Sequence, residues 1–458
     1  MAEQLSRKRT NLLVAVLFLG GFVLLLGETF MNNALPQVMR DMHVNQATAQ
    51  WVSTGYMMVS GLMIPVSAWT FHRFQLRPTF FTLMLIFIIG CAISWFSPSF
   101  GWLLAGRLIQ AVSAGAIIPL TNNVLLVAYP KKIRGMMMGL SGIIISFAPA
   151  IGPSLSGWVI DHFGWRMLFG ILTPVSAVIL FISFFTTKNI TSTRPVKIDG
   201  LGLMYETLGL GAILFALSTV GNDGKITLTV IVSLVVGIIL CAFFVHRSNH
   251  VDDPVANLRV LKNRHFDLMT LLSSTSNIAL VGIELVMPLY NQDVRGLSAF
   301  HSGLTLLLGA ILMGIMNPIS GWLYDRMGIK KLAIIGNTIV VLGTLPMLFF
   351  NQGTSIVVIV LTYAFRCVGI GFSMMSLFTA SINALPKEQE IDGNAVGSTL
   401  RQVAGSLGTA VMMMVVSLCA HGTNHVAALA NGYHAAYLTA LIIAVFSLVL
   451  SCLLPKKA

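Results

Sequence analysis

The stretch Gly321-Trp322-Leu323-Tyr324-Asp325-Arg326-Met327-Gly328-Ile329-Lys330-Lys331 separates two long apolar runs, residues 301–324 and 331–350. Its polar part is only a few residues long, which is typical of a tight turn between two helices. A related stretch at residues 68–77 (AWTFHRFQLR) follows the apolar run 49–70 in the same way. The sequence therefore predicts long apolar helices that are joined by short basic turns and arranged in two related halves.

The amino-acid composition indicates that these helices lie in a membrane. Hydrophobic residues make up 56% of the 458-residue chain and charged residues only 10%, whereas soluble domains carry about 25% charged residues. About 20 apolar residues cross the hydrocarbon core as a helix. We therefore expect an all-α polytopic membrane protein with fourteen transmembrane helices, at residues 12–34, 49–70, 79–96, 100–126, 136–160, 166–186, 201–220, 226–245, 268–290, 301–324, 331–350, 355–380, 394–419 and 434–454.

The basic residues predict the orientation. With a cytoplasmic N-terminus, 21 Lys and Arg residues fall in inside segments and four, Arg40, Arg166, Lys225 and Arg295, in outside segments. Short cytoplasmic loops carry an excess of Lys and Arg. An even number of spans with both termini cytoplasmic gives this distribution.

Several classes of function are disfavoured. The net charge is +12, and the basic residues that give it lie in short loops. This distribution is typical of loops that face anionic lipid and not of nucleic-acid binding. The five cysteines lie inside apolar runs and indicate neither a disulfide framework nor a metal site. No glycine-rich stretch ends in the Lys-Ser/Thr of a phosphate-binding loop. We expect no enzyme activity, no cofactor, no metal and no nucleic-acid partner.

Four further stretches narrow the family. They are residues 50–57 (QWVSTGYM), 107–110 (RLIQ), 148–157 (APAIGPSLSG) and 401–408 (RQVAGSLG). Together with the turn at 321–331, this ordered series resembles the major facilitator superfamily, and within it the 14-helix drug–proton antiporters similar to EmrB and QacA. The resemblance covers essentially the whole chain.

Two departures from the family pattern matter. The first helix of that branch usually reads D-x-T-x-x-N-x-A-L-P, but here Gly27 stands at the usual acid and the carboxylate, Glu28, follows one residue later. One residue is a rotation of about 100° around the helix. The first-half turn also has His72 and Gln75 where the family has Asp and Gly, so its role as a lock is less secure than that of the second copy.

The resemblance implies a domain organisation. Residues 1–200 would form an N-terminal six-helix half, 201–263 an inserted helix pair with a cytoplasmic connector, and 264–458 a C-terminal six-helix half. The two halves of such transporters rock around a central binding site.

Three buried charges are candidates for proton coupling. Counting from the outer helix ends, Glu28 and Arg107 both lie about 10 Å below the outer surface, so that they could meet. A carboxylate in hydrocarbon costs about 2.5 kcal/mol or more and usually has a function. Glu28 is either a proton-exchanging acid or part of a permanent ion pair. Glu284, at a similar height in the ninth run, is either a second titrating acid or an interfacial residue.

Two motifs bear on conformational change. Ala148, Gly152, Pro153 and Gly157 belong to the antiporter motif, where a small-residue face and a proline favour close packing and a bend. Gly321, Asp325, Arg326 and Gly328, with Arg73 in the first copy, would form a cytoplasmic gate. We expect Asp325 to interact with the positive end of a neighbouring helix.

Three other charges lie within apolar runs. Arg366 lies near mid-membrane and needs a partner that the sequence does not identify. Arg401 is seven residues inside the thirteenth run and could reach the cytoplasm. Glu206, near the inner end of the seventh run, is expected at the interface.

The resemblance implies proton-coupled efflux of amphipathic or cationic drugs across the cytoplasmic membrane of a bacterium, by a monomer whose partners are its small-molecule substrate, protons and the lipid bilayer. Two alternatives stay open. One is export of a physiological lipid, siderophore or metabolite, and the other is a membrane sensor without transport.

Overall fold

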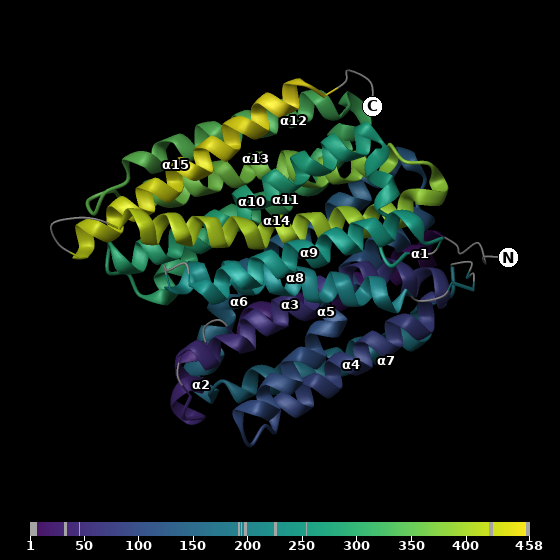
Figure 1. Cartoon of the computed structure of the whole chain (residues 1–458), viewed down its shortest axis with the longest axis horizontal. Coiled ribbons are helices and arrows are strands. Elements are labelled where there is room, and N and C mark those ends of the chain that lie inside the picture. The colour runs from purple at the N-terminus through teal and green to yellow at the C-terminus, as the bar shows by residue number, and fades with distance from the viewer. Residues whose placement is uncertain are drawn as a thin grey trace. The chain divides into compact units, whose positions relative to one another are not determined.

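The structure is a computed structural model that describes residues 7–31, 34–44, 46–190, 193, 195–196, 199–223, 227–252, 254–420 and 425–454. Within these ranges the chain forms helices and no strand (Figure 1). Asn32 and Asn33 of the first-helix motif lie outside the described residues. The predicted all-α fold is confirmed for the described part of the chain.

The helices follow one another with short connections. The N-terminal ones are α1 (Arg7–Phe30), α2 (Leu35–Asp41), α3 (Gln46–Arg73), α4 (Leu76–Trp95), α5 (Phe100–Ala128), α6 (Lys131–Phe163) and α7 (Arg166–Thr186). The later ones are α8 (Gly200–Asp223), α9 (Leu228–His250), η1 (Leu258–Lys262), α10 (Arg264–Asp293), α11 (Ala299–Met327), α12 (Ile329–Thr344), η2 (Leu345–Phe349), α13 (Ile356–Asn383), η3 (Lys387–Gln389), α14 (Glu390–Cys419) and α15 (His425–Cys452).

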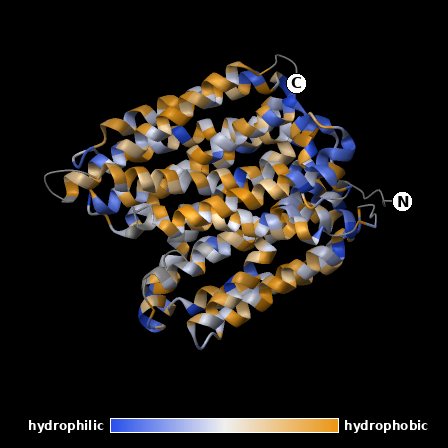
Figure 2. Cartoon of the chain, in the orientation of Figure 1, coloured by the Kyte–Doolittle hydropathy of each residue, from blue (hydrophilic) through white to orange (hydrophobic). Residues whose placement is uncertain are grey.

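Length and apolarity make most of these helices able to cross a membrane. Twelve candidate spans are found in the described residues. Two further helices, α3 with 28 residues and α8 with 24, coincide with the predicted runs 49–70 and 201–220. Figure 2 shows apolar residues along the helices and hydrophilic residues gathered towards helix ends, as expected where helix ends meet water.

The chain divides into two compact units. The first comprises Met1–Pro130, Phe147–Gly200 and Asp252–Ala256, and the second comprises Lys131–Ser146, Leu201–Val251 and Asn257–Ala458. The helix α6 therefore contributes its first part to the second unit and its remainder to the first. The inserted pair α8 and α9 belongs to the second unit.

The same helix pairings recur in both units. In the first, α5 packs against α1, α3 and α4, and α7 packs against α1 and α4. In the second, α13 packs against α10, α11 and α12, and α15 packs against α10 and α12. This correspondence is what the repeated turn sequences indicate, because α3 and α4 flank the first turn and α11 and α12 flank the second.

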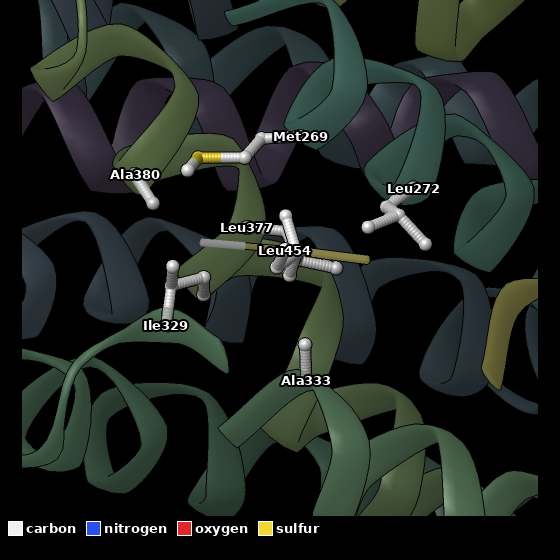
Figure 3. Close-up of a cluster of buried hydrophobic side chains, with 7 residues drawn as sticks. All are labelled: Met269, Leu272, Ile329, Ala333, Leu377, Ala380 and Leu454. Atoms are coloured by element: carbon white, nitrogen blue, oxygen red, sulfur yellow. The ribbon is translucent and has the colours of Figure 1, made fainter. Parts of the chain in front are cut away.

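Apolar side chains hold the second unit together near the end of α15. Met269 and Leu272 of α10, Ile329 and Ala333 of α12, and Leu377 and Ala380 of α13 form a buried cluster with Leu454. Figure 3 shows these side chains converging from separate helices. Burial of each large side chain contributes about 1.5–3 kcal/mol in water, less in a bilayer, where close packing rather than transfer from water supplies the stability.

The inserted helices α8 and α9 pack closely through small residues. Gly209 of α8 lies against Cys241 of α9, and Gly237 of α9 lies against Ile213. Glu206 of α8 interacts electrostatically with Cys241 and is 0% exposed. Glu206 is therefore covered by protein, because α9 packs against this side of α8, and its place at the membrane interface stays a prediction.

The crossing of α3 and α5 depends on a glycine. A Cβ added to Gly115 of α5 would meet the backbone carbonyl of Ser60 in α3. Small residues allow such close backbone approach in membrane helix pairs.

We expect Gly115→Val to lower the stability of the first unit by roughly 1–3 kcal/mol, because overpacking forces the two backbones apart. The measurement is the thermal unfolding midpoint of the purified protein at a fixed scan rate. Gly101→Ala, also in α5, is the matched control, since a Cβ at Gly101 meets nothing within 4 Å. Equal midpoints for the two variants would contradict this packing.

Candidate functional site

The first unit contains a fully buried arginine whose donors are taken up by the chain itself. Arg107 of α5 is 0% exposed. Its Nη1 donates to the backbone carbonyl of Gly27 at 2.8 Å and to Oε1 of Gln110 at 2.9 Å. Its Nη2 donates to the backbone carbonyl of Glu28 at 3.4 Å, and its Nε to that of Val52 in α3 at 3.5 Å. The guanidinium group thus ties α5 to α1 and α3.

Aromatic and polar neighbours complete this arrangement. The Arg107 guanidinium carbon lies 4.0 Å from the centre of the Tyr56 ring, and the Tyr56 hydroxyl donates to the carbonyl of Leu24 at 3.2 Å. Gln110 in turn donates to Oγ of Ser94 in α4 at 3.0 Å. A cation over an aromatic face, with every neighbour hydrogen-bonded, is stable in a dry interior.

Glu28 lies next to this arginine but is less enclosed. Its side chain is half-buried, and it interacts electrostatically with Arg107. The two predicted partners are therefore brought together, through a backbone hydrogen bond and through charge.

The packing around Gly27 bears on why the acid stands at position 28 and not at position 27. A Cβ on Gly27 would lie 3.0 Å from Cζ of Phe87 in α4. A larger side chain at position 27 would therefore press against this ring.

The antiporter motif packs against the same part of α1. A Cβ added to Gly152 of α6 would meet Oγ1 of Thr29, the residue after Glu28. Ala148, one turn earlier in α6, is fully buried, and Gly157 is half-buried. The helix α6 is assigned as continuous through residues 148–157, and the side chain of Pro153 lies outside the described ones. Gly152 thus keeps α6 close to the acid.

The second unit repeats the pairing of an acid and an arginine. Arg366 of α13 is 0% exposed. Its Nη2 donates to the backbone carbonyl of Ala279 in α10, and its Nε donates to Oγ1 of Thr344 in α12 at 3.1 Å. Glu284 of α10 is half-buried and interacts electrostatically with Arg366. These are the partners of Arg366 that the sequence left unidentified.

The two arrangements share one chemistry. In each unit a fully buried arginine on one helix donates to a backbone carbonyl of the helix that carries a half-buried acid. The cation stabilises the charged form of the carboxyl, whereas burial favours its neutral form. A carboxyl between these influences is suited to bind and release a proton.

The second-copy turn lies against the start of α6. The carboxylate of Asp325 accepts hydrogen bonds from the backbone N–H groups of Gly135 and Met136. A Cβ on Gly321 would meet the backbone of Gly135, so the two helices cross closely here. Negative charge is stabilised near a helix N-terminus.

The remaining gate residues shape the turn itself. Gly328 has a φ of 77°, which favours glycine and lets α12 begin directly after α11. The Arg326 guanidinium carbon lies 4.0 Å from the centre of the Trp322 ring. Arg73 is exposed at the end of α3 in the first unit.

A buried ion pair near this turn escaped the sequence interpretation. Nη1 of Arg134, in the first turn of α6, lies 2.9 Å from Oε2 of Glu390 at the start of α14, and their side chains are 6% and 4% exposed. Nζ of Lys131 lies 3.2 Å from Oε1 of Glu390. Asn383 accepts from Arg134 at 3.4 Å and donates to the Tyr324 hydroxyl at 3.2 Å.

A weak sequence signal for this pair exists. Residues 130–135 (PKKIRG) and 386–393 (PKEQEIDG) both open a helix after a proline, one with basic and the other with acidic residues. The apolar-run criterion placed both segments in loops, because it ends a span at the first charged residues. The helices continue past that point and carry the charges in their first turns.

Arg401 of α14 differs from Arg107 and Arg366. It is 8% exposed, and its guanidinium carbon lies 3.8 Å from the centre of the Phe378 ring in α13. Within the described ranges, no group of three or more His, Cys, Asp or Glu side chains is placed to bind a metal ion.

Comparison with known sequences identifies relatives along most of the chain. Residues 17–409 match the family described as Major Facilitator Superfamily. The chain is 41% identical over 449 residues to the Bacillus subtilis protein named Uncharacterized MFS-type transporter YcnB, covering 97% of this chain and 95% of that one. It is 36% identical over 410 residues to the lincomycin resistance protein LmrB of B. subtilis, covering 88% and 85%. It is 29% identical over 384 residues to the multidrug resistance protein B homolog of Mycobacterium tuberculosis, covering 82% and 71%.

Solved structures show the same fold at low sequence identity. The human organic anion transporter MFSD10 matches with a TM-score of 0.67 at 16% identity, covering 95% of this chain and 99% of that one. The proton:xylose symporter XylE matches with a TM-score of 0.66 at 14% identity, covering 98% of each chain.

We expect Glu390→Gln to destabilise the protein by about 3–5 kcal/mol, because it leaves Arg134 buried without its counter-charge. The double variant Arg134→Leu/Glu390→Leu should lose much less than the sum of its single variants. The measurement is a double-mutant cycle on unfolding midpoints. The exposed Lys132→Gln is the matched control, and strictly additive effects at positions 134 and 390 would rule out the pair as a stabilising unit.

Proposed function

The chain belongs to the Major Facilitator Superfamily and is a multi-pass transporter of the cell membrane, and from this premise we propose that it exports amphipathic or cationic drugs and other toxic compounds in exchange for protons. The observation that carries the proposal is the half-buried Glu28 beside the fully buried Arg107. Relatives named for lincomycin and multidrug resistance support the substrate class.

Proton binding at Glu28 would be the coupling step. When the carboxyl is charged, Arg107 attracts it, and when the carboxyl takes up a proton that attraction falls. Arg107 is hydrogen-bonded to the backbone of α1 and α3, so a change at Glu28 acts directly on the packing of these helices. Glu284 and Arg366 would play the same part in the second unit.

Conformational change would involve the close helix contact at Gly152 and the charged residues at the cytoplasmic helix ends. Gly152 holds α6 against Thr29, so that the antiporter motif and the acid would move together. Asp325 with the start of α6, and Arg134 with Glu390, would close the cytoplasmic side in one state and separate in the other. The protein would thereby alternate between inward-open and outward-open states.

The proposed topology has fourteen spans with both termini cytoplasmic, as in the EmrB and QacA branch. Its halves would be residues 1–200 and 264–458, with 201–263 as the inserted pair and connector. The lengths of α3 and α8 and the high apolarity of α9 support this number. We propose that a monomer carries out the full cycle.

The topology predicts opposite labelling of the two ends of α9. In a cysteine-free background, Lys225→Cys should react with a membrane-impermeant maleimide added to intact cells. Arg247→Cys should react only after the membrane is permeabilised. Labelling of both residues from one side would contradict a spanning α9.

The coupling predicts that Glu28→Gln abolishes substrate-driven proton movement. In proteoliposomes with an acidic lumen, adding lincomycin or ethidium should dissipate the pH gradient for the parent protein. The rate should fall by at least tenfold in Glu28→Gln, because an amide takes up no proton in this range, and should be partly retained in Glu28→Asp. An internal pH-sensitive dye reports the rate.

Glu388→Gln is the matched control, since Glu388 is exposed in η3 and its loss should leave the rate unchanged. A full rate in Glu28→Gln combined with loss in Glu284→Gln would move the proton site to the second unit. Full rates in both variants would refute coupling through these acids.

A further inference from the structure

A buried cation without a counter-charge lies in the second unit. Nε of Arg401 has no hydrogen-bond partner, and its Nη1 lies 3.7 Å from the thioether Sδ of Met375. In the part of the chain that the structure describes, no carboxylate forms an ion pair with Arg401. The face of the Phe378 ring offers a partial substitute, because an aromatic ring attracts a cation, but it accepts no in-plane hydrogen bond from the guanidinium.

Three helices meet at this arginine. Asn277 of α10 donates from Nδ2 to the backbone carbonyl of Arg401 in α14 at 2.7 Å. Ser273 of α10 donates from Oγ to the carbonyl of Met374 in α13 at 3.2 Å. The guanidinium group therefore lies where α10, α13 and α14 pack at one level.

Hydroxyl groups without partners lie on the adjoining helix faces. The side-chain oxygens of Thr270, Ser274 and Ser398 are buried and make no hydrogen bond. Residues three and four apart share a helix face. Thr270 and Ser274 thus lie on the Asn277 face of α10, and Ser398 lies on the Arg401 face of α14. Because Asn277 contacts Arg401, these two faces are turned toward each other.

Arg401 differs from the other two buried arginines in its charge partners. Arg107 and Arg366 donate to backbone carbonyls, and each interacts electrostatically with an acid. Nη1 of Arg366 also lacks a hydrogen-bond partner, so the nearby acid is what separates these two arginines from Arg401. A buried charge is tolerated when it is paired and hydrogen-bonded. Arg401 has a positive charge and a donor without a partner, and hydroxyl groups without partners lie nearby. Such groups can together bind an anion, for example a carboxylate or phosphate group.

We propose that Arg401, with Ser398, Ser274 and Thr270, binds an anionic group of the transported solute. The inference deepens the proposed export function and rests on it, by giving the amphipathic substrate an acidic group. Arg401 lies eleven residues after Glu390, about 16 Å along α14. This depth favours a solute in the transport path over the headgroup of a lipid at the membrane surface.

The test compares two probes that differ only in charge. Dansylglycine carries a carboxylate, and dansylglycinamide is its neutral amide. Binding to the full-length protein in phosphatidylcholine nanodiscs is followed by energy transfer from tryptophan to dansyl. The parent protein should bind dansylglycine at least about tenfold more tightly than the amide, since hydrogen bonds to charged groups contribute that much.

Arg401→Gln should remove this preference, and Arg264→Gln, which changes an exposed cation at the start of α10, should keep it. A tenfold preference that persists in Arg401→Gln would overturn the proposal. If Arg401→Gln does not purify as a folded protein, Ser274→Ala/Ser398→Ala decides, because it keeps the charge. That double variant should lose severalfold in preference, and an unchanged preference would refute the site.

Two further binding experiments identify the source of the anionic group. The preference should persist when the nanodiscs contain phosphatidylglycerol, and its loss there would assign the site to a lipid headgroup and contradict the proposal. Inorganic phosphate should compete weakly, because it lacks the apolar part, and tight competition would assign the site to a free ion. No proton gradient is present, so failure of this binding is distinguishable from failure of the proton coupling.

Discussion

The structure depends above all on how it accommodates two fully buried guanidinium groups, those of Arg107 and Arg366. An isolated charge in hydrocarbon is costly. Arg107 and Arg366 offset that cost by donating to backbone carbonyls of a neighbouring helix, α1 and α10 respectively. Because the acceptors belong to the backbone, each arginine links its own helix directly to the helix that carries the acid. The acids Glu28 and Glu284 lie half-buried and interact electrostatically with these arginines.

At the start of α6, the helix dipole determines which charges are stable. Asp325 accepts from the first turns of α6, where the helix dipole favours an acid. Arg134 stands in the same turns, where the dipole disfavours a cation, and Glu390 compensates it. Both interactions break if these helix ends separate, which makes this group of charges suited to distinguish one conformation from another.

Hydrophobic patterning predicted most of the fold, and charge placement predicted part of the site. Each predicted apolar run overlaps a helix. The similar depths estimated for Glu28 and Arg107 agree with the hydrogen bond from Arg107 to the backbone of Glu28. The partners of Arg366 could not be predicted, since Ala279 contributes a backbone carbonyl that no side-chain pattern marks. The Arg134–Glu390 pair was missed because hydropathy ends a helix where charge begins. The burial of Glu206 was not predicted, because packing between α8 and α9 leaves no trace in the hydropathy of either helix.

We propose that Glu28 takes up and releases a proton under the influence of Arg107. Infrared difference spectroscopy of the purified protein tests it most directly, by recording the protonated-carboxyl band while pH is varied. We predict a band that disappears in Glu28→Gln. Its midpoint should move to higher pH in Arg107→Gln, because the carboxylate loses its cation. A spectrum identical in the parent protein and in Glu28→Gln would contradict it.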